Sequence, residues 1–427
     1  MQNTPISIAA VFGTRPEAVK LLPVIRHLRQ DARFDLRVVV TGQHREMLRE
    51  ILEPFGIRPD VDLDIMQPGQ SLNDIVCRAM PRLDELYGRE PPDWVVVQGD
   101  TTSAFCAALA AFDRRIPVAH VEAGLRSFDR SHPYPEESNR RMLSAVAELH
   151  FAPTPWAAQN LLREGVPRDR VVVTGNTVID ALLLTLQDDL EGRRASTEST
   201  AKRRIVLITM HRREAWESAH GRGEPSVLDG ILSAIRRAAD RNPDVDFIYP
   251  VHLNPKVQEA AKRAFCGAKN ARLIEPLPYV RFVKTMARAS VIVTDSGGVQ
   301  EEAPSLGIPV LVLRETTERP EALETGANRL IGTDPDDIEE ALVTALERPT
   351  DGQVGGRSSP ADGGALTVPR PSPFGDGCAS ARIAQSFLYL AGEAEAPEPF
   401  APLDEEMSRS LPRSRGKRRA AAGLRSH

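Results

Sequence analysis

The chain has 427 residues, of which 41% are hydrophobic and 26% are charged, and its formal net charge is -5. This length exceeds what one hydrophobic core usually serves, so we expect two domains, and the composition excludes a mostly disordered or fibrous chain. The mildly negative charge gives no general attraction to nucleic acid or to an anionic membrane, so neither is an expected partner.

The cysteines and the first residues indicate the compartment. The four cysteines are scattered and form neither a CxxC motif nor a Cys/His pattern, which is typical of reduced thiols in cytosol and predicts no structural zinc. No run of about 18 apolar residues occurs, and the polar start at residues 1–5 is too short for a signal peptide. We therefore expect a cytoplasmic protein.

Short apolar runs, each followed by a segment of helical length, recur along the chain. Consecutive apolar positions are typical of strands buried on both faces of a parallel sheet. A first series is predicted at residues 6–12, 36–41, 94–98, 118–121, 149–152 and 171–174. A second series follows at residues 205–209, 247–249, 272–274, 291–294, 310–313 and 329–331. The pattern predicts an α/β fold with two Rossmann-like, doubly wound parallel-sheet domains.

The apolar periodicity stops near residues 188–202, where Glu, Ser, Thr and Arg take over, so the domain boundary should lie there. This predicts an N-terminal domain at 1–187, a C-terminal nucleotide-binding domain at 203–349, a flexible Gly/Pro/Ser-rich loop at 350–373 and a closing helix at 374–390. Residues 391–427 carry an acidic stretch and then a basic one, which is typical of a disordered, solvated tail. An anionic partner for the basic stretch is the alternative.

Polar residues follow directly after the predicted strands of the N-terminal domain. Ligands bind beyond the carboxyl ends of the strands in open parallel sheets, so these residues are the first candidates for a site. After the first strand, Gly13 permits a tight turn, and Arg15 and Lys20 offer cationic donors for phosphate. An ordinary turn with a surface Arg and Lys is the alternative interpretation of this segment.

Three carboxylates are expected at the same edge of the first sheet. Asp100 follows the third strand, Glu122 follows the fourth, and Glu136 lies in the segment PEESNR, which leads into a helix. Acids that converge in this way suit general acid and base catalysis, and their spacing matches no metal site. Helix caps and salt bridges are the alternative explanation.

The second domain offers cations and a helix start at its strand ends. His211 and Arg212 follow its first strand, and no second histidine stands at ligand spacing, which suits a diphosphate better than a metal. The segment from Ser296 to Gly298 should begin a helix whose free N–H groups and positive dipole end suit a diphosphate. Glu302, about one helical turn later, could accept hydrogen bonds from ribose hydroxyl groups. Arg319 follows the next strand.

Together these motifs resemble those of the non-hydrolysing UDP-N-acetylglucosamine 2-epimerases. The resemblance extends from residue 13 to about residue 390 and leaves only the tail unmatched. The segments that carry it stand in the family's order: GTRPEAVK, TGQH, QGDTT, HVEAGLRS, PEESNRR, HRRE, PVHLNP, TDSGGVQEEAPSLG and TTERPE. The resemblance implies a GT-B-like architecture with the active site in the interdomain cleft, UDP-N-acetylglucosamine as substrate, no cofactor, and a homodimer.

The resemblance also implies roles for individual residues. Catalytic roles fall on Asp100, Glu122, Glu136 and His211. Nucleotide binding falls on Arg15, Lys20, Ser296, Gly297, Gly298, Glu302 and Arg319, with Leu277 and Phe282 around the uracil. A possible allosteric site for a second substrate molecule would comprise Gln43, His44, Gln70, Arg212 and His252.

Three departures from the family pattern concern domain closure and regulation rather than chemistry. Ala215 stands where a polar residue is usual, and the segments 216–225 and 350–371 are longer than usual.

The chemistry of C2 limits the mechanism. The C2 proton is not next to a carbonyl, so simple deprotonation would demand an unreasonable carbanion, and no GxGxxG motif follows a predicted strand, which speaks against NAD. Elimination and re-addition of UDP is the remaining route to UDP-N-acetylmannosamine. The alternatives are a hydrolysing epimerase that releases UDP and N-acetylmannosamine, a GT-B glycosyltransferase, and a non-catalytic nucleotide-sugar sensor.

Overall fold

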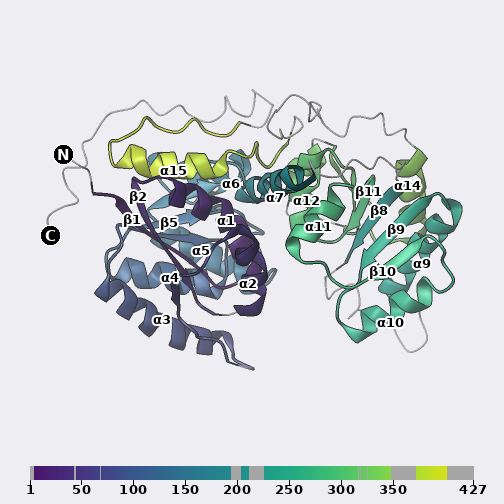
Figure 1. Cartoon of the computed structure of the whole chain (residues 1–427), viewed down its shortest axis with the longest axis horizontal. Coiled ribbons are helices and arrows are strands. Elements are labelled where there is room, and N and C mark those ends of the chain that lie inside the picture. Colours follow the sequence, from purple (N-terminus) through teal and green to yellow (C-terminus); the bar gives the residue numbers. More distant parts are fainter. Residues whose placement is uncertain are drawn as a thin grey trace. The chain divides into compact units, whose positions relative to one another are not determined.

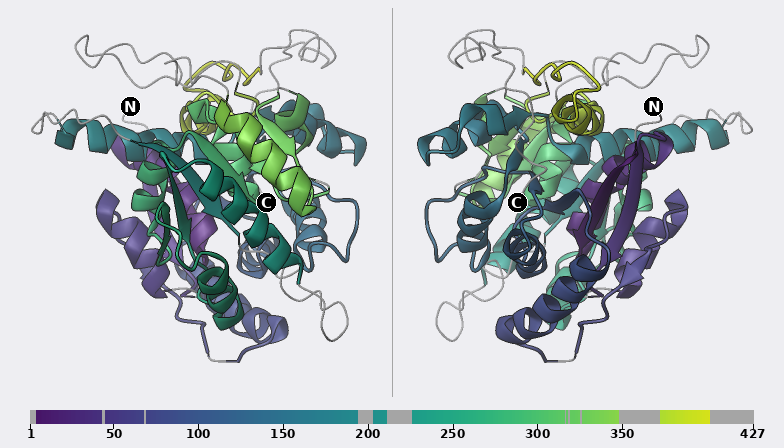
Figure 2. Two further views of the ribbon diagram at one scale, coloured as in Figure 1. Left: turned by 90° about the vertical axis from the view of Figure 1, so that its right-hand side faces the viewer. Right: turned by 90° about the vertical axis from the view of Figure 1, so that its left-hand side faces the viewer.

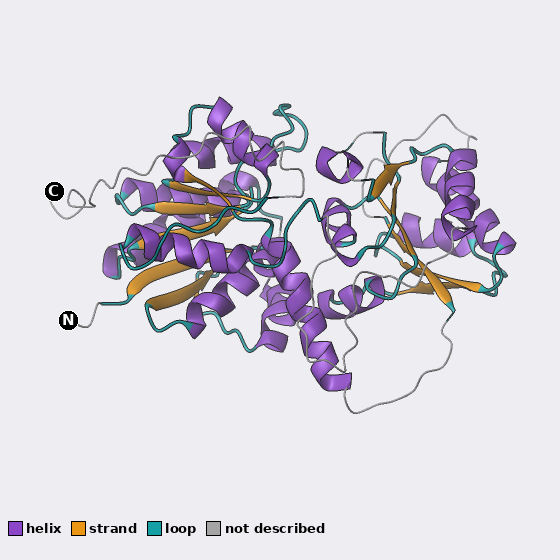
Figure 3. Ribbon diagram, turned by 90° about the horizontal axis from the view of Figure 1, so that it is seen from above, coloured by secondary structure: helices purple, strands orange, loops and turns teal. Residues whose placement is uncertain are grey.

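The computed structural model describes residues 4–42, 45–67, 69–193, 203–210, 226–315, 317, 319–324, 326–347 and 372–401. The chain divides into two compact units (Figure 1). The N unit comprises Met1–Ala181 together with Phe374–His427, and the C unit comprises Leu182–Pro373. In each unit, helices cover the faces of one sheet (Figure 3).

The N unit is built on a seven-stranded sheet in the order β3-β2-β1-β4-β5-β6-β7, in which every neighbouring pair is parallel. Its strands are β1 (Ile6–Phe12), β2 (Phe34–Val40), β3 (Val61–Asp62), β4 (Trp94–Gln98), β5 (Val118–Val121), β6 (Leu149–Ala152) and β7 (Val171–Val173). Its helices are α1 (Arg15–Gln30), α2 (Arg45–Leu52), α3 (Leu72–Arg89), α4 (Thr102–Asp113), α5 (Glu136–Val146), α6 (Pro155–Arg163), the start of α7 (Thr177–Arg193), and α15 (Ala379–Leu390), with short 3-10 turns at Glu53–Phe55 and Arg168–Arg170.

The C unit has a six-stranded parallel sheet in the order β10-β9-β8-β11-β12-β13. Its strands are β8 (Arg204–Thr209), β9 (Val245–Pro250), β10 (Ala271–Ile274), β11 (Val291–Thr294), β12 (Val310–Val312) and β13 (Asn328–Leu330). Its helices are α9 (Val227–Arg241), α10 (Pro255–Ala264), α11 (Tyr279–Met286), α12 (Gly297–Glu302), α13 (Pro320–Glu324) and α14 (Pro335–Glu347), with a 3-10 turn at Pro304–Leu306.

Both sheets share the Rossmann strand order, in which the first strand lies beside the fourth. The order reverses between β1 and β4 in the N unit and between β8 and β11 in the C unit. Ligands of such sheets bind beyond the carboxyl ends of the strands at this switch point. The turns after these four strands are therefore the candidate ligand-binding sites of the fold.

The packing of the N unit depends on small side chains in α4. This helix carries Ser103, Ala104, Ala107, Ala108 and Ala111, all buried, so it packs closely on the sheet and on α3. Thr101 begins the helix by accepting the N–H of Ala104 at 3.0 Å. The turn that joins β4 to the start of α4 is short, and Asp100 lies in it.

The predicted fold class is confirmed, and all twelve predicted strands occur with bounds shifted by a few residues at most. The prediction missed β3, which has only two residues, Val61–Asp62, and no apolar run. Among the described helices, none combines the length and hydropathy that a membrane crossing requires. The described residues also contain no group of three or more His, Cys, Asp and Glu side chains suited to a metal.

The chain returns to the N unit at Phe374. Helix α15 packs against α1, and Phe387 lies 5.4 Å from the ring of Trp94 and 5.8 Å from that of Phe151, measured between ring centroids. The right-hand view of Figure 2 faces this unit and shows α15 in yellow at one side of it. Because these contacts join the ends of the chain, the N unit is discontinuous in sequence.

The structure of the first part of the predicted tail differs from the sequence-based prediction. Residues 391–401 lie against the N unit: Phe400 is buried, and its N–H donates to the carbonyl of Val173 at 2.8 Å. Residues 391–401 are therefore docked on the N unit through Phe400 rather than disordered, although most of them are exposed, while 402–427 lie outside the described residues. The predicted loop at 350–373 also lies outside them, except for its last two residues.

Candidate active site

The turn after β1 is tied to the turn after β4 by a buried glutamate. Glu17 accepts the N–H groups of Gly13 and Thr14 at 2.9 and 2.7 Å, and the hydroxyl of Thr101 at 2.6 Å. Burial raises the pKa of Glu17 above its usual value, although these hydrogen bonds act in the opposite direction. A Cβ atom on Gly13 would lie 2.2 Å from the hydroxyl oxygen of Thr41, so only glycine fits this turn.

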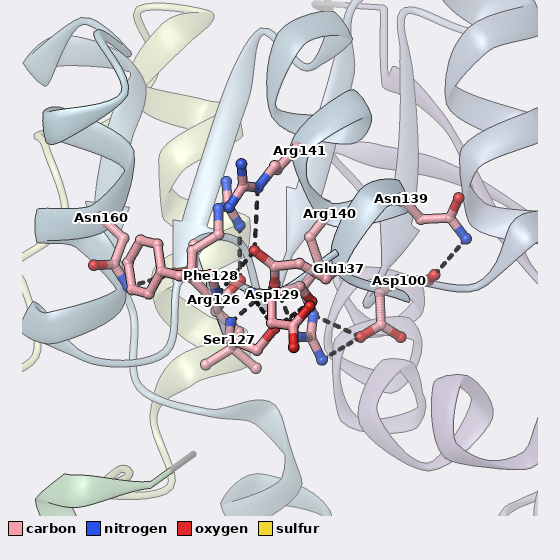
Figure 4. Close-up of polar contacts among 12 residues, drawn as sticks. Asp100, Arg126, Ser127, Phe128, Asp129, Glu137, Asn139, Arg140, Arg141 and Asn160 are labelled. Atoms are coloured by element: carbon pink, nitrogen blue, oxygen red, sulfur yellow. Dashed lines mark hydrogen bonds and ion pairs between the residues drawn. The ribbon is translucent and has the colours of Figure 1, made fainter. Parts of the chain in front are cut away.

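Asp100 lies at the end of β4 and is held by α5 (Figure 4). The Nε and Nη2 atoms of Arg140 donate to its Oδ2 at 2.8 and 2.7 Å, and the side chain of Asn139 donates to its backbone carbonyl at 2.9 Å. No described residue bonds to Oδ1 of Asp100. This oxygen is therefore available to a ligand.

Glu122 follows β5 with a positive φ of 66°, a conformation that side chains rarely adopt. Its two carboxylate oxygens accept from Lys20 of α1 and from Gln98 of β4. The structure thus brings together Lys20, a predicted nucleotide ligand, and Glu122, a predicted catalytic residue.

Glu136 and Arg15 are the first residues of α5 and α1, and both side chains are half-buried. Within the described parts of the chain, no hydrogen bond or ion pair is found for either side chain. Both are therefore available to a ligand.

A network of charges surrounds the turns after β4 and β5. Burial by itself lowers the pKa of the Arg140 guanidinium, but the carboxylates of Asp100, Glu122 and Glu137 raise it overall. His120 of β5 is fully buried, and its Nε2 lies 2.7 Å from the carbonyl of Gly99. Burial lowers the pKa of His120 to about 4, so its ring is neutral at pH 7.

In the C unit, the start of α12 lies beside an arginine. A Cβ atom on Gly297 would lie 2.7 Å from the guanidinium carbon of Arg319, whereas one on Gly298 would meet nothing within 4 Å. The Nε of Arg319 donates to Glu301 at 2.6 Å. Ser296 precedes the helix, and its N–H donates to the hydroxyl of Thr294 at 2.9 Å. A helix start beside a fixed guanidinium is suited to an anion.

Glu302 ends the same helix and is buried. The hydroxyl of Tyr279 in α11 donates to its Oε1 at 3.1 Å. Leu277 and Phe282, the residues expected around a base, flank Tyr279 in sequence, and both are half-buried. The predicted base and ribose contacts therefore lie on two segments of the C unit that this hydrogen bond joins.

Two of the predicted allosteric residues, Gln70 and His252, lie in the described part of the chain. Gln70 belongs to the N unit and accepts from Arg78 at 2.8 Å, and His252 belongs to the C unit and accepts the N–H of Asn254 at 3.1 Å. The remaining predicted site residues lie outside the described residues: Gln43, His44, His211 and Arg212.

Sequence reasoning missed several residues that shape these turns. Glu17 could have been found, because Thr14 and Glu17 form the Thr-x-x-Glu pattern of a helix start. Others gave no local signal, because their partners lie far away in the sequence: His120, Asn139, Arg140 and Tyr279. The partners of Glu137 lie within ten positions, but two adjacent glutamates do not show which of them is buried.

Two Rossmann-like parallel-sheet units with polar turns at their switch points define a GT-B-like protein, a fold shared with a glycosyltransferase of kitacinnamycin at 15% identity and a TM-score of 0.55. Residues 26–388 match the family model described as UDP-N-acetylglucosamine 2-epimerase. The chain therefore belongs to the UDP-N-acetylglucosamine 2-epimerase family.

Individual relatives are similar in sequence to this chain over nearly their whole length. The UDP-N-acetylglucosamine 2-epimerase of Salmonella typhimurium is 46% identical over 388 residues, which cover 89% of this chain and 98% of that protein. The crystal structure of UDP-GlcNAc 2-epimerase from Neisseria meningitidis bound to UDP-GlcNAc is similar with a TM-score of 0.76 and 41% identity, covering 90% of this chain and 100% of that one.

Proposed function

We propose that this protein reversibly converts UDP-N-acetylglucosamine to UDP-N-acetylmannosamine without net hydrolysis. Its family membership supports the substrate class, and the structure determined with UDP-GlcNAc concerns a relative of 41% identity. The observation that carries the proposal is the meeting of α5 with the turns after β4 and β5, where Arg140 contacts Asp100 and lies in the field of Glu122. Proton transfer at one carbon needs carboxylates collected in this way.

The reaction proceeds by elimination and re-addition. A carboxylate removes the C2 proton while the bond between C1 and the diphosphate oxygen breaks. The electron pair of that C1–O bond leaves with UDP. A double bond forms between C1 and C2. UDP then adds back to C1 while a proton is delivered to C2 from the opposite face, so atoms and charge balance.

The two units divide this work in the proposal. The N unit supplies Asp100, Glu122 and Glu136 for proton transfer at C2. The C unit holds the diphosphate at Ser296–Gly298 with Arg319, and Glu302 accepts hydrogen bonds from the ribose hydroxyl groups. His211 and Arg15 add positive charge at the phosphates. Water must be excluded from the bound substrate in this proposal, because water attack on the intermediate would turn epimerisation into hydrolysis.

The proposal extends to assembly and regulation. We expect a cytoplasmic homodimer, which sedimentation equilibrium would reveal as twice the monomer mass. We also expect Gln43, His44, Gln70, Arg212 and His252 to bind a second substrate molecule. A sigmoidal dependence of the rate on UDP-N-acetylglucosamine would support that role, and a hyperbolic dependence would contradict it.

Proton NMR of UDP-N-acetylglucosamine with enzyme in heavy water tests the reaction. The expected result is UDP-N-acetylmannosamine with deuterium at C2 and no stoichiometric UDP. Accumulating UDP with free N-acetylmannosamine would assign a hydrolysing epimerase instead. No change at all would contradict epimerisation and favour a transferase or a sensor.

A further inference from the structure

Two neighbouring glutamates of α5 have opposite environments. Glu136 is half-buried and finds no partner among the described residues, as expected of a group that meets substrate. Glu137 is fully buried, with none of its surface exposed. A buried carboxylate is costly unless it is paired and hydrogen-bonded, so its partners indicate what it does.

The carboxylate of Glu137 collects donors from a loop and from its own helix (Figure 4). The N–H groups of Ser127 and Phe128 donate to it at 2.9 and 3.2 Å. Arg141 donates at 3.1 Å and Arg140 at 3.4 Å. It therefore connects the loop between β5 and α5 with the two arginines of the helix.

Arg140 has hydrogen-bond acceptors on two sides of its guanidinium group. Its Nε and Nη2 atoms donate to Asp100, and its remaining nitrogen, Nη1, faces Glu137. Because a guanidinium is planar and rigid, acceptors on two sides fix its plane. The orientation of Arg140 toward Asp100 thus depends on Glu137.

The loop is constrained at the same point. Phe128 has a φ of 62°, which disfavours any residue other than glycine, and its side chain is 60% exposed, so burial of the ring does not explain the conformation. The bonds from Ser127 and Phe128 to Glu137 hold this turn. The loop begins after Glu122 and ends at Glu136, so fixing its middle helps to fix both ends.

We propose that Glu137 is a positioning residue: it orients Arg140 on Asp100 and anchors the loop that joins Glu122 to Glu136. It touches no substrate and acts through these partners. The inference rests on the proposed function, because Asp100, Glu122 and Glu136 are there the groups that transfer protons.

The variant Glu137→Gln tests this role, with Arg141→Met as the matched control. Arg141 bonds to the same carboxylate, but no contact between it and Asp100 is found in the described residues. We expect kcat of E137Q to fall about tenfold to a hundredfold, because small displacements of catalytic groups have effects of this size. The dissociation constant for UDP should stay within about twofold of wild type, and R141M should keep kcat within about threefold.

A pH profile separates positioning from simple support of the fold. Release of Arg140 in E137Q would leave Asp100 without its cationic partner, so the acid limb of kcat/KM should move to higher pH by about 0.5–1 unit. Loss of folding support alone would leave this limb unchanged. The charged or titratable groups around this position are Arg140 and Arg141 of α5, Asp100 after β4, His120 of β5, and Glu122 and Arg126 after β5.

Several results would overturn the proposal. These are a kcat of E137Q within about threefold of wild type, equal losses of kcat in E137Q and R141M at equal melting temperatures, or an unmoved acid limb. If E137Q does not fold, Glu137→Asp retains the charge, so it should keep the wild-type acid limb and still lower kcat because it is one methylene shorter. Wild-type kcat in E137D would then contradict the idea.

The test of the role of Glu137 can be separated from the test of the proposed reaction. Wild-type turnover is measured first, and its absence would refute the proposed function alone. A crystal structure of E137Q then decides the inference without any turnover. Arg140 turned away from Oδ2 of Asp100 supports it, and an unchanged contact refutes it.

Discussion

The two units share one strand order but present different chemistry at their switch points. In the N unit, the first turn after β1 is closed by the protein itself, because Glu17 occupies the N–H groups of Gly13 and Thr14. In the C unit, α12 begins with two glycines beside Arg319. A helix start that already holds a carboxylate has little left for a phosphate, whereas the start of α12 is suited to one.

This difference shows how one topology serves two purposes. The N unit uses its strand ends to hold Asp100 and Glu122 against Arg140 and Lys20, and the C unit uses them to hold a helix start and a guanidinium. The sheet only positions the turns, and the residues in the turns decide the chemistry. Substitutions of Asp100, Glu122 or Glu136 should therefore change turnover, and those at Ser296–Gly298 or Arg319 should change nucleotide affinity.

The largest expected effect is that of Asp100→Asn. Loss of a proton-transfer group should lower kcat about 10²- to 10⁴-fold. The dissociation constant for UDP should remain within about twofold, because Asp100 is assigned to proton transfer and not to UDP binding. Turnover is followed by NMR and binding by calorimetry. The control Asp84→Asn removes an exposed acid paired with Arg114 on the same unit and should change neither quantity. Loss of UDP affinity in D100N would break the proposed division between the units.

The next effect concerns stability where the chain leaves and re-enters the N unit. Asp180 of α7 is buried and accepts from the N–H and hydroxyl of Ser380 in α15 at 2.8 and 2.6 Å. Burial raises its pKa to about 6, so between about pH 4 and pH 6 the folded chain keeps a proton that the unfolded chain releases. This group therefore stabilises the fold most at low pH, and about 3 kcal/mol is lost as the pH rises through 6.

Urea unfolding of Asp180→Asn at pH 4.5 and pH 7 tests this sign. The variant cannot ionise, so its midpoint relative to wild type should rise between the two values. Asp376→Asn is the matched control. Burial would raise the pKa of Asp376, but its contact with Arg382 holds it below the usual value of 3.8, so the stabilisation from this residue is lost only below about pH 4. The midpoint of this variant relative to wild type should therefore stay nearly constant between pH 4.5 and pH 7. Equal shifts in both variants would rule out the explanation.

A smaller effect is expected from Gly297→Ala. The added Cβ atom would displace the guanidinium of Arg319, so UDP affinity should fall about tenfold to a hundredfold, the range of one charge-assisted hydrogen bond. Turnover at saturating substrate should change less. If the effect acts through Arg319, adding G297A to Arg319→Ala should cost little more affinity than Arg319→Ala alone. Additive losses in calorimetry would show that it acts elsewhere.

The smallest effect is expected from Tyr279→Phe. This change removes the hydroxyl that orients Glu302, so UDP affinity should fall about threefold to tenfold. The preference for UDP over 2′-deoxy-UDP should shrink as well, since Glu302 is the proposed ribose acceptor. An unchanged preference would remove Glu302 from that role.

Much of the fold could be predicted because strands buried on both faces carry local apolar runs, as in β1 and β4. The same method missed β3, whose pairing with β2 involves only two residues. It also missed the docking of Phe400, because one apolar residue in an acidic segment has no period to detect. Glu17 was within reach through its helix-start pattern, whereas the roles of His120 and Asn139 depend on carbonyl groups in another turn.

The sequence by itself determined the two-domain α/β class, the family, and which residue types follow each strand, because all of these are carried by short segments of contiguous chain. Only the tertiary structure decided that Lys20 pairs with Glu122, that Arg140 holds Asp100, and that Glu137 rather than Glu136 is the buried acid of α5. These pairings join residues as far apart as 102 positions. The sheet brings such residues together at one edge, and the geometry of that edge has no counterpart in any local pattern.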